Sequence, residues 1–367
     1  MKIGILTFFN AHNYGAVLQA YALKTYCEKL GYQVKIINYR NKHIDAAYPR
    51  KLRPRIGKKD FFCPWKWNNI ILEIDRMIFS RKSWKSQWNK FEIFIEEKLG
   101  VTKGADWKEE VKECDFLIFG SDQIWERNIV GRKEKVLFGE LDSKAKKISY
   151  AASCYGIDSK LDSLLIKQLD SFIAVSVRES HLAKAIATVK NNIVPVEVVD
   201  PVFLPNPQVY RDMTHFVPNE KKYKLFYYVS ECRELDRISR YLTEQNELVI
   251  EIHYYNTHKI HYKNQLSDVG PYEFVGYLLY ADTIYTNSFH GVAFSIILHK
   301  QFWALNTNIR LINLLNNLGI SDRNVIGFDD WLKKSNELLD FSISDSKLID
   351  LVKRSKNFLN ENLKVEY

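Results

Sequence analysis

Short apolar runs that end in small or polar residues recur along the chain, and they constrain its fold most strongly. Asp115–Phe119, Ile148–Ala152 and Phe172–Val177 are such runs, and each is followed directly by Gly, Ser or Arg. Apolar runs without alternation are typical of strands buried on both faces of a parallel sheet. Similar runs, several of them separated by helical spacing, lie at 2–9, 32–39, 196–199, 224–229, 248–252 and 283–285. The chain is therefore predicted to be α/β.

Two domains are expected, because 367 residues exceed what one small core organises. Prolines punctuate 201–218, and we place the boundary there. Residues 1–205 are predicted to form an N-terminal Rossmann-like domain, and residues 206–367 a C-terminal Rossmann-like domain. The segments 114–121 and 281–288 share a small residue, Asp, an apolar strand and a polar turn, which fits two similar halves facing across a cleft. Packing of the last helix back on the first domain is left open.

The segment from about 42 to 103 is interpreted as a helical insertion in the first domain. Residues 50–90 hold 12 of the 53 Lys/Arg but three of the 44 Asp/Glu, so this segment carries the whole net charge of +9. Half of the eight tryptophans also lie in it. Two interpretations remain open: a solvated insertion whose tryptophans pack on their own domain, or a surface for anionic lipid head groups or a lipid-diphosphate-linked sugar.

Several classes of protein are disfavoured by what the sequence lacks. No run of about 18 apolar residues is present, so no membrane span is expected. The five cysteines are scattered and include no C-x-x-C pair, which favours reduced thiols in the cytoplasm over a zinc site. No G-x-G-x-x-G follows the first strand, so a dinucleotide cofactor is not expected. His253, His258 and His261 have uneven spacing, and we expect no metal there.

Hydroxyls, an amide, an imidazole and a glycine gather where the strand Thr283–Tyr285 passes to a helix expected from Val292. The intervening residues are Thr286 to Gly291. In an open α/β sheet, ligands bind outside the carboxyl ends of the strands, and a helix N-terminus offers N–H donors to an anion. A binding site for an anionic ligand is therefore predicted at this turn.

Six short motifs together resemble the polysaccharide pyruvyl transferase family, and they occur in the family's order. They are Lys2–Ile5 with Asn13–Ala16 and Leu18–Ala20; Gly120–Trp125; Ser149–Ser153; Ser176–Glu179; Asp200–Leu204; and Thr286–Gly291. The resemblance implies two Rossmann-like domains in a GT-B-like arrangement. It also implies transfer of pyruvate from phosphoenolpyruvate to sugar hydroxyls as a ketal, with no cofactor, on a cytoplasmic glycan precursor. The insertion is not covered by these motifs.

The resemblance and the strand-end positions together suggest roles for individual residues. His290 is the expected general acid/base, Arg178 the expected bidentate ligand of phosphate or carboxylate, and Asp122 the expected acceptor of the sugar proton. The expected donor-binding residues are Asn287, Ser288, Gly291, Gly120, Ser121 and Arg310, and the expected acceptor-binding residues are Asn13, Tyr14, Gln123 and Trp125.

Each role has a structural alternative. His290 could satisfy a buried turn, Arg178 could pair with Glu179 or another carboxylate, and Asp122 or Ser121 could cap a helix. The residues 13–15 could simply form a turn, and Trp125 could pack in the hydrophobic core. Asp200 is assigned to structure, as the start of a turn.

Ser288 departs from part of the family, in which some members carry Arg two residues before the histidine. If that Arg holds the donor, the charge must come from elsewhere in this chain. Arg178 is the first candidate, followed by Arg310 and Arg323.

Two other functions compete with this interpretation. A nucleotide-sugar glycosyltransferase of the same architecture would need an acidic ribose ligand after the His290 helix, and none is clear in the sequence. A nucleic-acid-binding protein could use residues 50–90, although no RRM, KH or zinc-finger pattern is present. The expected partners are phosphoenolpyruvate and a lipid- or nucleotide-linked sugar, with contact to an anionic membrane left open.

Overall fold

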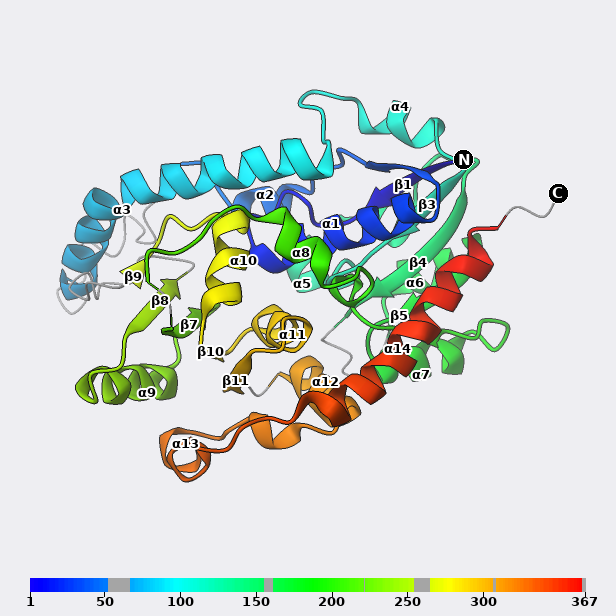
Figure 1. Ribbon diagram of the computed structural model, residues 1–367. Helices are drawn as coiled ribbons and strands as arrows, with labels where there is room; N and C mark the ends of the chain where they lie inside the picture. The colour runs from blue at the N-terminus through cyan, green and yellow to red at the C-terminus, as the bar shows by residue number, and fades with distance from the viewer. Residues whose placement is uncertain (52–66, 155–160, 221, 254–264, 306–307, 365–367) are drawn as a thin grey trace. The chain divides into compact units, whose positions relative to one another are not determined.

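The computed structural model describes residues 1–51, 67–154, 161–220, 222–253, 265–305 and 308–364. The chain divides into two compact units, each with its own sheet (Figure 1). Unit 1 comprises Met1–Tyr48, Phe94–Gln208 and Ser342–Tyr367, and unit 2 comprises Pro49–Ile93 and Val209–Phe341. The predicted α/β class with two parallel sheets is confirmed. The cleft expected between the two halves stays a prediction.

Unit 1 contains a six-stranded parallel sheet in the order β2-β1-β3-β4-β5-β6. Its central strands are apolar on both faces; β3, for example, is buried at every residue. That is why the sequence shows these strands as unbroken apolar runs. The strands are β1 (Lys2–Leu6), β2 (Gln33–Ile36), β3 (Phe116–Phe119), β4 (Lys146–Ala152), β5 (Phe172–Val177) and β6 (Val196–Glu197).

Helices and short turns connect the strands of unit 1. The first connection has the βαβ form expected from the sequence, with α1 between β1 and β2. The helical elements are α1 (Tyr14–Lys29), α2 (Lys42–Ala47), the π-helix η3 (Ile95–Leu99), α4 (Trp107–Lys112), α5 (Arg127–Val130), α6 (Ser163–Gln168), α7 (Ser180–Val189), and the 3-10 turns η4 (Val136–Phe138), η5 (Leu169–Ser171) and η6 (Pro201–Phe203).

Unit 2 contains a five-stranded parallel sheet in the order β11-β10-β7-β8-β9. Its strands are β7 (Lys224–Tyr228), β8 (Val249–His253), β9 (Gln265–Leu266), β10 (Thr283–Thr286) and β11 (Gln301–Ala304). Its helical elements are α3 (Trp67–Phe94), α8 (Gln208–Met213), α9 (Arg233–Glu244), α10 (Pro271–Tyr280), α11 (Phe289–Ile297), α12 (Ile309–Leu318), η7 (Ser321–Arg323) and α13 (Phe328–Lys334). Neither β9 nor β11 was expected from the sequence.

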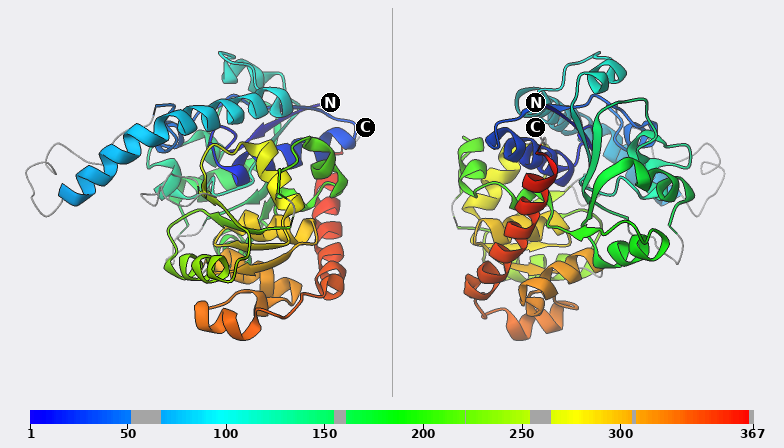
Figure 2. Two further views of the ribbon diagram at one scale, coloured as in Figure 1. Left: turned by 60° about the vertical axis from the view of Figure 1, so that its left-hand side comes forward. Right: turned by 90° about the vertical axis from the view of Figure 1, so that its right-hand side faces the viewer.

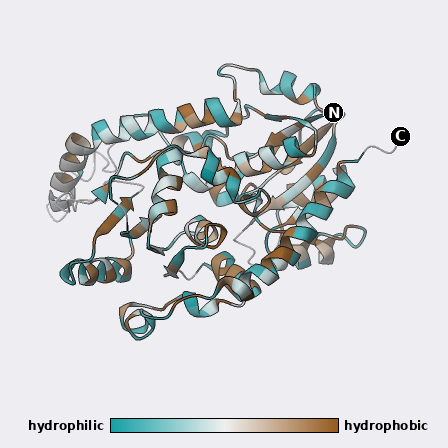
Figure 3. Ribbon diagram, viewed as in Figure 1, coloured by the Kyte–Doolittle hydropathy of each residue, from teal (hydrophilic) through white to brown (hydrophobic). Residues whose placement is uncertain are grey.

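The helices of unit 2 place an apolar stripe on the sheet. In Figure 3, α9 shows hydrophobic and hydrophilic colours side by side along its turns. Its buried Leu235, Ile238 and Leu242 belong to one apolar cluster with Phe226 and Val249 of the neighbouring strands. Spacing of three and four residues puts these side chains on one helix face, and their burial favours docking of α9 on the sheet. Among the described residues, no helix is long and apolar enough to cross a membrane.

The units follow the chain less simply than the sequence boundary at 205 suggests. Residues 49–93, which the sequence analysis placed within an insertion in the first domain, belong to unit 2, and residues 342–367 belong to unit 1. The last helix, α14 (Phe341–Asn362), lies beside α1 (Figure 2). There the Tyr26 hydroxyl donates to Asn360 Oδ1 at 3.4 Å, and Ser355 Oγ accepts from the backbone N–H of Val199 at 2.9 Å.

Candidate active site

The winding of each sheet defines one position where a ligand is expected. Ligands bind to open parallel sheets outside the carboxyl ends of the strands, where the strand order reverses. In unit 1 the order reverses between β1 and β3, and in unit 2 between β7 and β10. The residues that follow β3 and β10 are Gly120–Gln123 and Asn287–Gly291. The segments selected from the sequence therefore lie at the two reversal points.

The turn after β3 has an unusual backbone. Gly120 has φ of +124°, and a Cβ on it would lie 2.2 Å from the carbonyl oxygen of Tyr150, so only glycine fits. Its peptide bond to Ser121 is cis. Asp122 and Ala151, on neighbouring segments, also have positive φ values of 72° and 50°. Non-glycine residues in this region cost about 1–3 kcal/mol each and cluster at functional sites.

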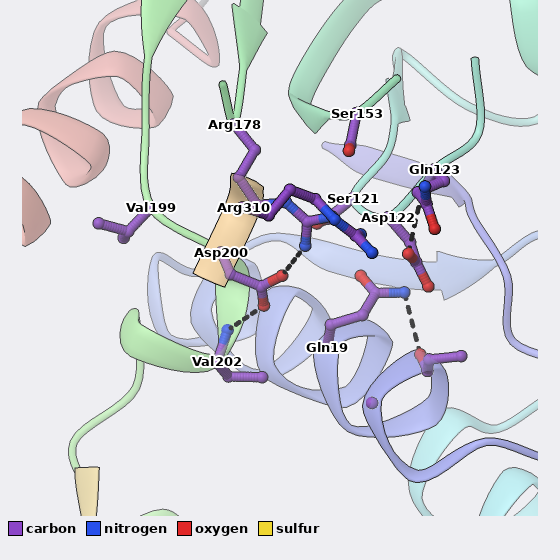
Figure 4. Close-up of polar contacts among 12 residues, drawn as sticks. Gln19, Ser121, Asp122, Gln123, Ser153, Arg178, Val199, Asp200, Val202 and Arg310 are labelled. Carbon is purple, nitrogen blue, oxygen red and sulfur yellow. Dashed lines mark hydrogen bonds and ion pairs between the residues drawn. The ribbon is translucent and has the colours of Figure 1, made fainter. Parts of the chain in front are cut away.

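A buried polar network supports this turn (Figure 4). Gln19 Nε2 donates to Thr7 Oγ1 at 2.8 Å, and Thr7 Oγ1 donates to the carbonyl of Ser121 at 3.1 Å. Within the described part of the chain, Ser121 Oγ, Gln19 Oε1 and Glu179 Oε2 are buried and make no hydrogen bond. Because a buried polar atom without a partner costs about 1–3 kcal/mol, these three oxygens lower the stability of the fold at this turn.

Arg178 follows β5 and is held by two buried carboxylates. Its Nη1 donates to Asp200 Oδ2 at 2.5 Å and its Nε to Glu179 Oε1 at 3.3 Å, as Figure 4 shows for the first pair. Burial lowers the pKa of Arg178, but the carboxylates of Asp200 and then Glu179 outweigh burial and raise it above its ordinary value. Glu179 is itself held by Ser153 Oγ, which donates to Oε1 at 2.6 Å.

These contacts favour the structural alternative for Arg178. Two carboxylates already compensate the charge of the guanidinium, so the cluster of Arg178, Glu179 and Asp200 has no net positive charge with which to attract a phosphate. Asp200 also accepts from the backbone N–H of Val202 at 3.1 Å, and it caps the turn η6 as expected.

The expected acceptor-binding residues separate into two groups. Asn13 is the N-cap of α1, where its Oδ1 accepts from Gly15 N at 2.9 Å, and Tyr14 is fully buried. Trp125 lies in the core of unit 1, with its Nε1 donating to the carbonyl of Leu137 at 3.1 Å. Both rings are buried, so neither Tyr14 nor Trp125 presents a face on which a sugar could stack in this structure. Gln123 and Asp122 are partly exposed at the turn.

The turn after β10 is shorter than expected, because α11 begins at Phe289 and not at Val292. Ser288 is its N-cap and accepts from Gly291 N at 3.2 Å. Thr286 Oγ1 accepts from Ser288 N at 3.0 Å, and a Cβ on Gly291 would lie 2.6 Å from this oxygen. Ser288 and Gly291 therefore build the helix start, which places His290 on the first turn of α11.

Asn287 joins the ends of the two central strands of unit 2. Its Oδ1 accepts from Val229 N at 2.9 Å, and its Nδ2 donates to the carbonyl and the hydroxyl of Ser230 at 2.9 and 3.1 Å. The amide is thus committed to the loop after β7, and it positions this edge of the sheet.

His290 and Arg310 lie at the same edge of the sheet in unit 2. Each follows one of two paired strands, β10 and β11, and each is on the first turn of the next helix. The Phe289 ring contacts the His290 imidazole edge to face, with centroids 5.2 Å apart. Asn308 caps α12 and accepts from Arg310 N at 2.9 Å. Two helix N-termini, an imidazole and a guanidinium therefore share this edge.

Comparison with known protein families shows which family the chain belongs to. The model of the family "Polysaccharide pyruvyl transferase" matches residues 13–308, which include both reversal points. The chain belongs to this family. It is therefore a transferase, and the resemblance inferred from the six motifs is confirmed.

Solved structures similar to this pyruvyl transferase family member are distant in sequence. MnaA of S. aureus, solved with UDP, is 11% identical over 97% of this chain and 92% of its own, with a TM-score of 0.49. The UDP-GlcNAc 2-epimerase of Methanocaldococcus jannaschii is 13% identical over 96% and 92%, with a TM-score of 0.45. The glycosyltransferase SnogD of Streptomyces nogalater is 9% identical over 98% and 95%, with a TM-score of 0.40. A search of curated proteins found no match.

Two further predictions about charged residues can be compared with the structure. Arg323 is one of the arginines predicted to supply the charge that Ser288 lacks. It is buried, its guanidinium lies 4.5 Å from the ring centroid of Trp303, and its Nη1 donates to the carbonyl of Glu337 at 2.9 Å. His253 forms a 2.8 Å pair with Glu251. His258 and His261 lie outside the described residues.

Gln19, Thr7 and Ser153 have no role predicted from the sequence, and Glu179 is predicted only as a partner of Arg178. A usable signal existed for Gln19, because it interrupts an otherwise apolar helix segment, Ala16 to Ala20, that is buried at every residue. A polar side chain at such a position needs a partner or a ligand.

Proposed function

We propose that this pyruvyl transferase moves the pyruvate group of phosphoenolpyruvate onto sugar hydroxyls as a ketal during synthesis of a cell-surface polysaccharide. The acceptor is a sugar linked to a lipid or a nucleotide, and the reaction takes place in the cytoplasm. The observation that carries the proposal is the position of His290 and Arg310 together at one edge of unit 2, within a chain of this family.

The edge of unit 2 suits the donor because of its charge. Phosphoenolpyruvate carries a phosphate and a carboxylate, which are attracted by helix N-termini and bound bidentately by a guanidinium. Of the three arginines considered for this task, Arg178 is neutralised by Asp200 and Glu179, and Arg323 is engaged in the interior. Arg310 is half-buried at the start of α12, and we assign it the charge that Ser288 does not supply.

The edge of unit 1 suits a sugar. Asp122 and Gln123 are partly exposed at the turn after β3, and their carboxylate and amide oxygens accept hydrogen bonds that sugar hydroxyls donate. This edge carries Asp122, Glu179 and Asp200 against Arg178, so an anionic donor is disfavoured there. We assign Asp122 as the base that removes the hydroxyl proton.

The reaction needs one proton delivered and two removed. A sugar oxygen bonds to C2 of phosphoenolpyruvate while His290 protonates C3, which turns the methylene into a methyl group. Phosphate then leaves with the electron pair of its bond to C2, and a second hydroxyl oxygen bonds to C2 and loses its proton. Phosphoenolpyruvate and a diol thus give a ketal and inorganic phosphate. An imidazole suits such proton transfer near neutral pH, and no further cofactor is needed.

Donor binding and transfer can be tested separately in the full-length protein. Arg310→Gln is expected to weaken phosphoenolpyruvate binding, measured by calorimetry, about 10- to 100-fold, since hydrogen bonds to charged groups contribute about 1.5–3 kcal/mol. His290→Asn is expected to bind the donor within about tenfold of wild type, yet to give no ketal by mass spectrometry with a panel of linked sugars. Arg240→Gln is the control, because Arg240 is an exposed arginine on α9 of the same unit.

Two results would contradict the proposal. Binding of a nucleotide sugar without binding of phosphoenolpyruvate would favour a glycosyltransferase. Normal transfer by His290→Asn with an unchanged melting curve would exclude the imidazole from the reaction.

A further inference from the structure

The long helix α3 exposes apolar and basic side chains on one face. Its exposed residues, among those whose side chains the structure describes, are Trp67, Ile74, Ile78, Arg81, Lys82, Lys85, Asn89 and Ile93. At about 100° per residue they fall within roughly 120° of the helix circumference. The Ile78 side chain is 65% exposed and Trp67 is 57% exposed. We call this the α3 face.

The opposite face of α3 is buried and partly polar. Glu73, Ser80 and Gln87 are buried there, and Gln87 Nε2 donates to the carbonyl of Val269 at 3.3 Å. Lys90, at the border, pairs with Glu273 at 2.8 Å. Phe91 and Phe94 are buried on the same side, so α3 has an apolar inner face like an ordinary surface helix. What distinguishes it is that Trp67, Ile74 and Ile78 are exposed on the outer face as well.

We propose that the α3 face binds the surface of an anionic lipid bilayer. Ile74, Ile78 and Trp67 supply apolar side chains for the boundary between head groups and acyl chains, and tryptophan is favoured at that depth. Arg81, Lys82 and Lys85 place their charged ends at the head groups while their stems lie along the apolar layer.

Charge favours a bilayer over a second copy of the chain. The exposed side chains described on α3 include three cations and no acid, so a two-fold contact between two α3 faces would oppose like charges. Branched aliphatic side chains such as Ile74 and Ile78 also have no favourable partner on a polynucleotide backbone. An anionic bilayer, in contrast, accommodates both the aliphatic and the cationic side chains of the α3 face. The inference rests on α3 alone and is independent of donor and acceptor.

The test uses flotation of the full-length protein with vesicles of equal parts phosphatidylcholine and phosphatidylglycerol, compared with vesicles of phosphatidylcholine alone. Wild type is expected to bind the anionic vesicles and to leave them as salt rises. Lys82→Gln with Lys85→Gln is expected to lower the partition coefficient about 25-fold, because each basic residue near an anionic surface contributes about fivefold. Ile74→Ser with Ile78→Ser is expected to lower it at least as far.

Helix α14 supplies matched controls. Its Ile343 and Ile349 are 54% and 65% exposed, and its Lys347 and Lys353 are exposed, but Asp350 shares their surface. The corresponding Ser and Gln double variants are expected to bind vesicles like wild type.

Any of four results would overturn the proposal. Wild type could bind both kinds of vesicle equally, or neither. The α3 variants could lose no more binding than the α14 variants. Sedimentation could show that Ile74→Ser with Ile78→Ser converts a dimer to a monomer without changing flotation, which would make the α3 face a contact between copies.

Discussion

Single residues at the two reversal points differ in whether their polar atoms are already committed. Asn287 and Ser288 use their side chains to hold the loop after β7 and the start of α11. Gln19 and Ser121 keep a buried oxygen without a hydrogen bond in the described structure. Residue type and position in the sequence suggested a polar site, but the contacts show which of its side chains are already used to hold the fold.

Arg178 is expected to act on stability more than on donor binding. Arg178→Met leaves Asp200 and Glu179 buried without their cation, so the free energy of unfolding in urea should fall by about 3–5 kcal/mol. Lys135→Met, which breaks an exposed pair with Glu140, is the control and should change little. Arg178→Lys, which keeps the charge, should retain phosphoenolpyruvate affinity.

The opposite pattern would restore the role first expected for Arg178. If Arg178→Lys melted like wild type but lost most of its affinity for the donor, the guanidinium would have to bind phosphate despite its carboxylate partners.

At the scale of elements, local capping decides where the site residues lie. Sequence periodicity suggested a helix from Val292, but the Ser288 cap starts α11 at Phe289. Likewise Asn13 caps α1, so Tyr14 lies in the helix and not in a binding loop. Caps depend on backbone geometry outside the helix, which apolar periodicity does not report.

A buried network between β8 and α9 makes the stability of unit 2 depend on pH. Burial raises the pKa of Glu251, but hydrogen bonds from His253, Ser239 and Gln265 outweigh it and hold the pKa below its usual value. A carboxyl whose pKa is lowered by folding stabilises the protein fully at pH values above its unfolded pKa of about 4.3. This stabilisation is lost as the pH falls through the lower pKa of the folded state.

Glu251→Gln should therefore flatten the acid limb of stability against pH. Its free energy of unfolding, measured in urea from about pH 7 to about pH 3, should fall less steeply than that of wild type. Glu247→Gln is the matched control, because Glu247 is exposed just before β8. Equal slopes for wild type and Glu251→Gln would show that the network does not titrate with folding.

At the scale of the molecule, the chain returns to unit 1 after completing unit 2. The aromatic ring of Phe358 on α14 is buried with its centroid 6.4 Å from that of Tyr150 on β4, and Leu359 and Leu363 are buried nearby in the chain. The last helix therefore belongs to the core of unit 1, although residues 209–341 of unit 2 lie between this helix and β4 in the sequence.

Removing the Phe358 ring should weaken unit 1 alone. Phe358→Ala is expected to lower its free energy of unfolding by about 3–5 kcal/mol through the cavity it leaves. Hydrogen exchange should then quicken in β4 and β5 but not in β7 or β10. Ile349→Ala, an exposed change on the same helix, is the control. Equal quickening in both sheets would mean that the two units unfold as one.

The sequence by itself determined the α/β class, most of the strands, the family and the two turns that form the candidate site. Those features depend on local patterns: unbroken apolar runs, polar strand ends and short motifs. Tertiary structure decided that residues 49–93 belong to unit 2 and residues 342–367 to unit 1. It also decided that Trp125 and Tyr14 are buried, and that Arg178 is neutralised while Arg310 lies with His290 at one edge of the sheet in unit 2. These depend on pairing between residues far apart in the chain, because burial and charge compensation are properties of neighbours in space.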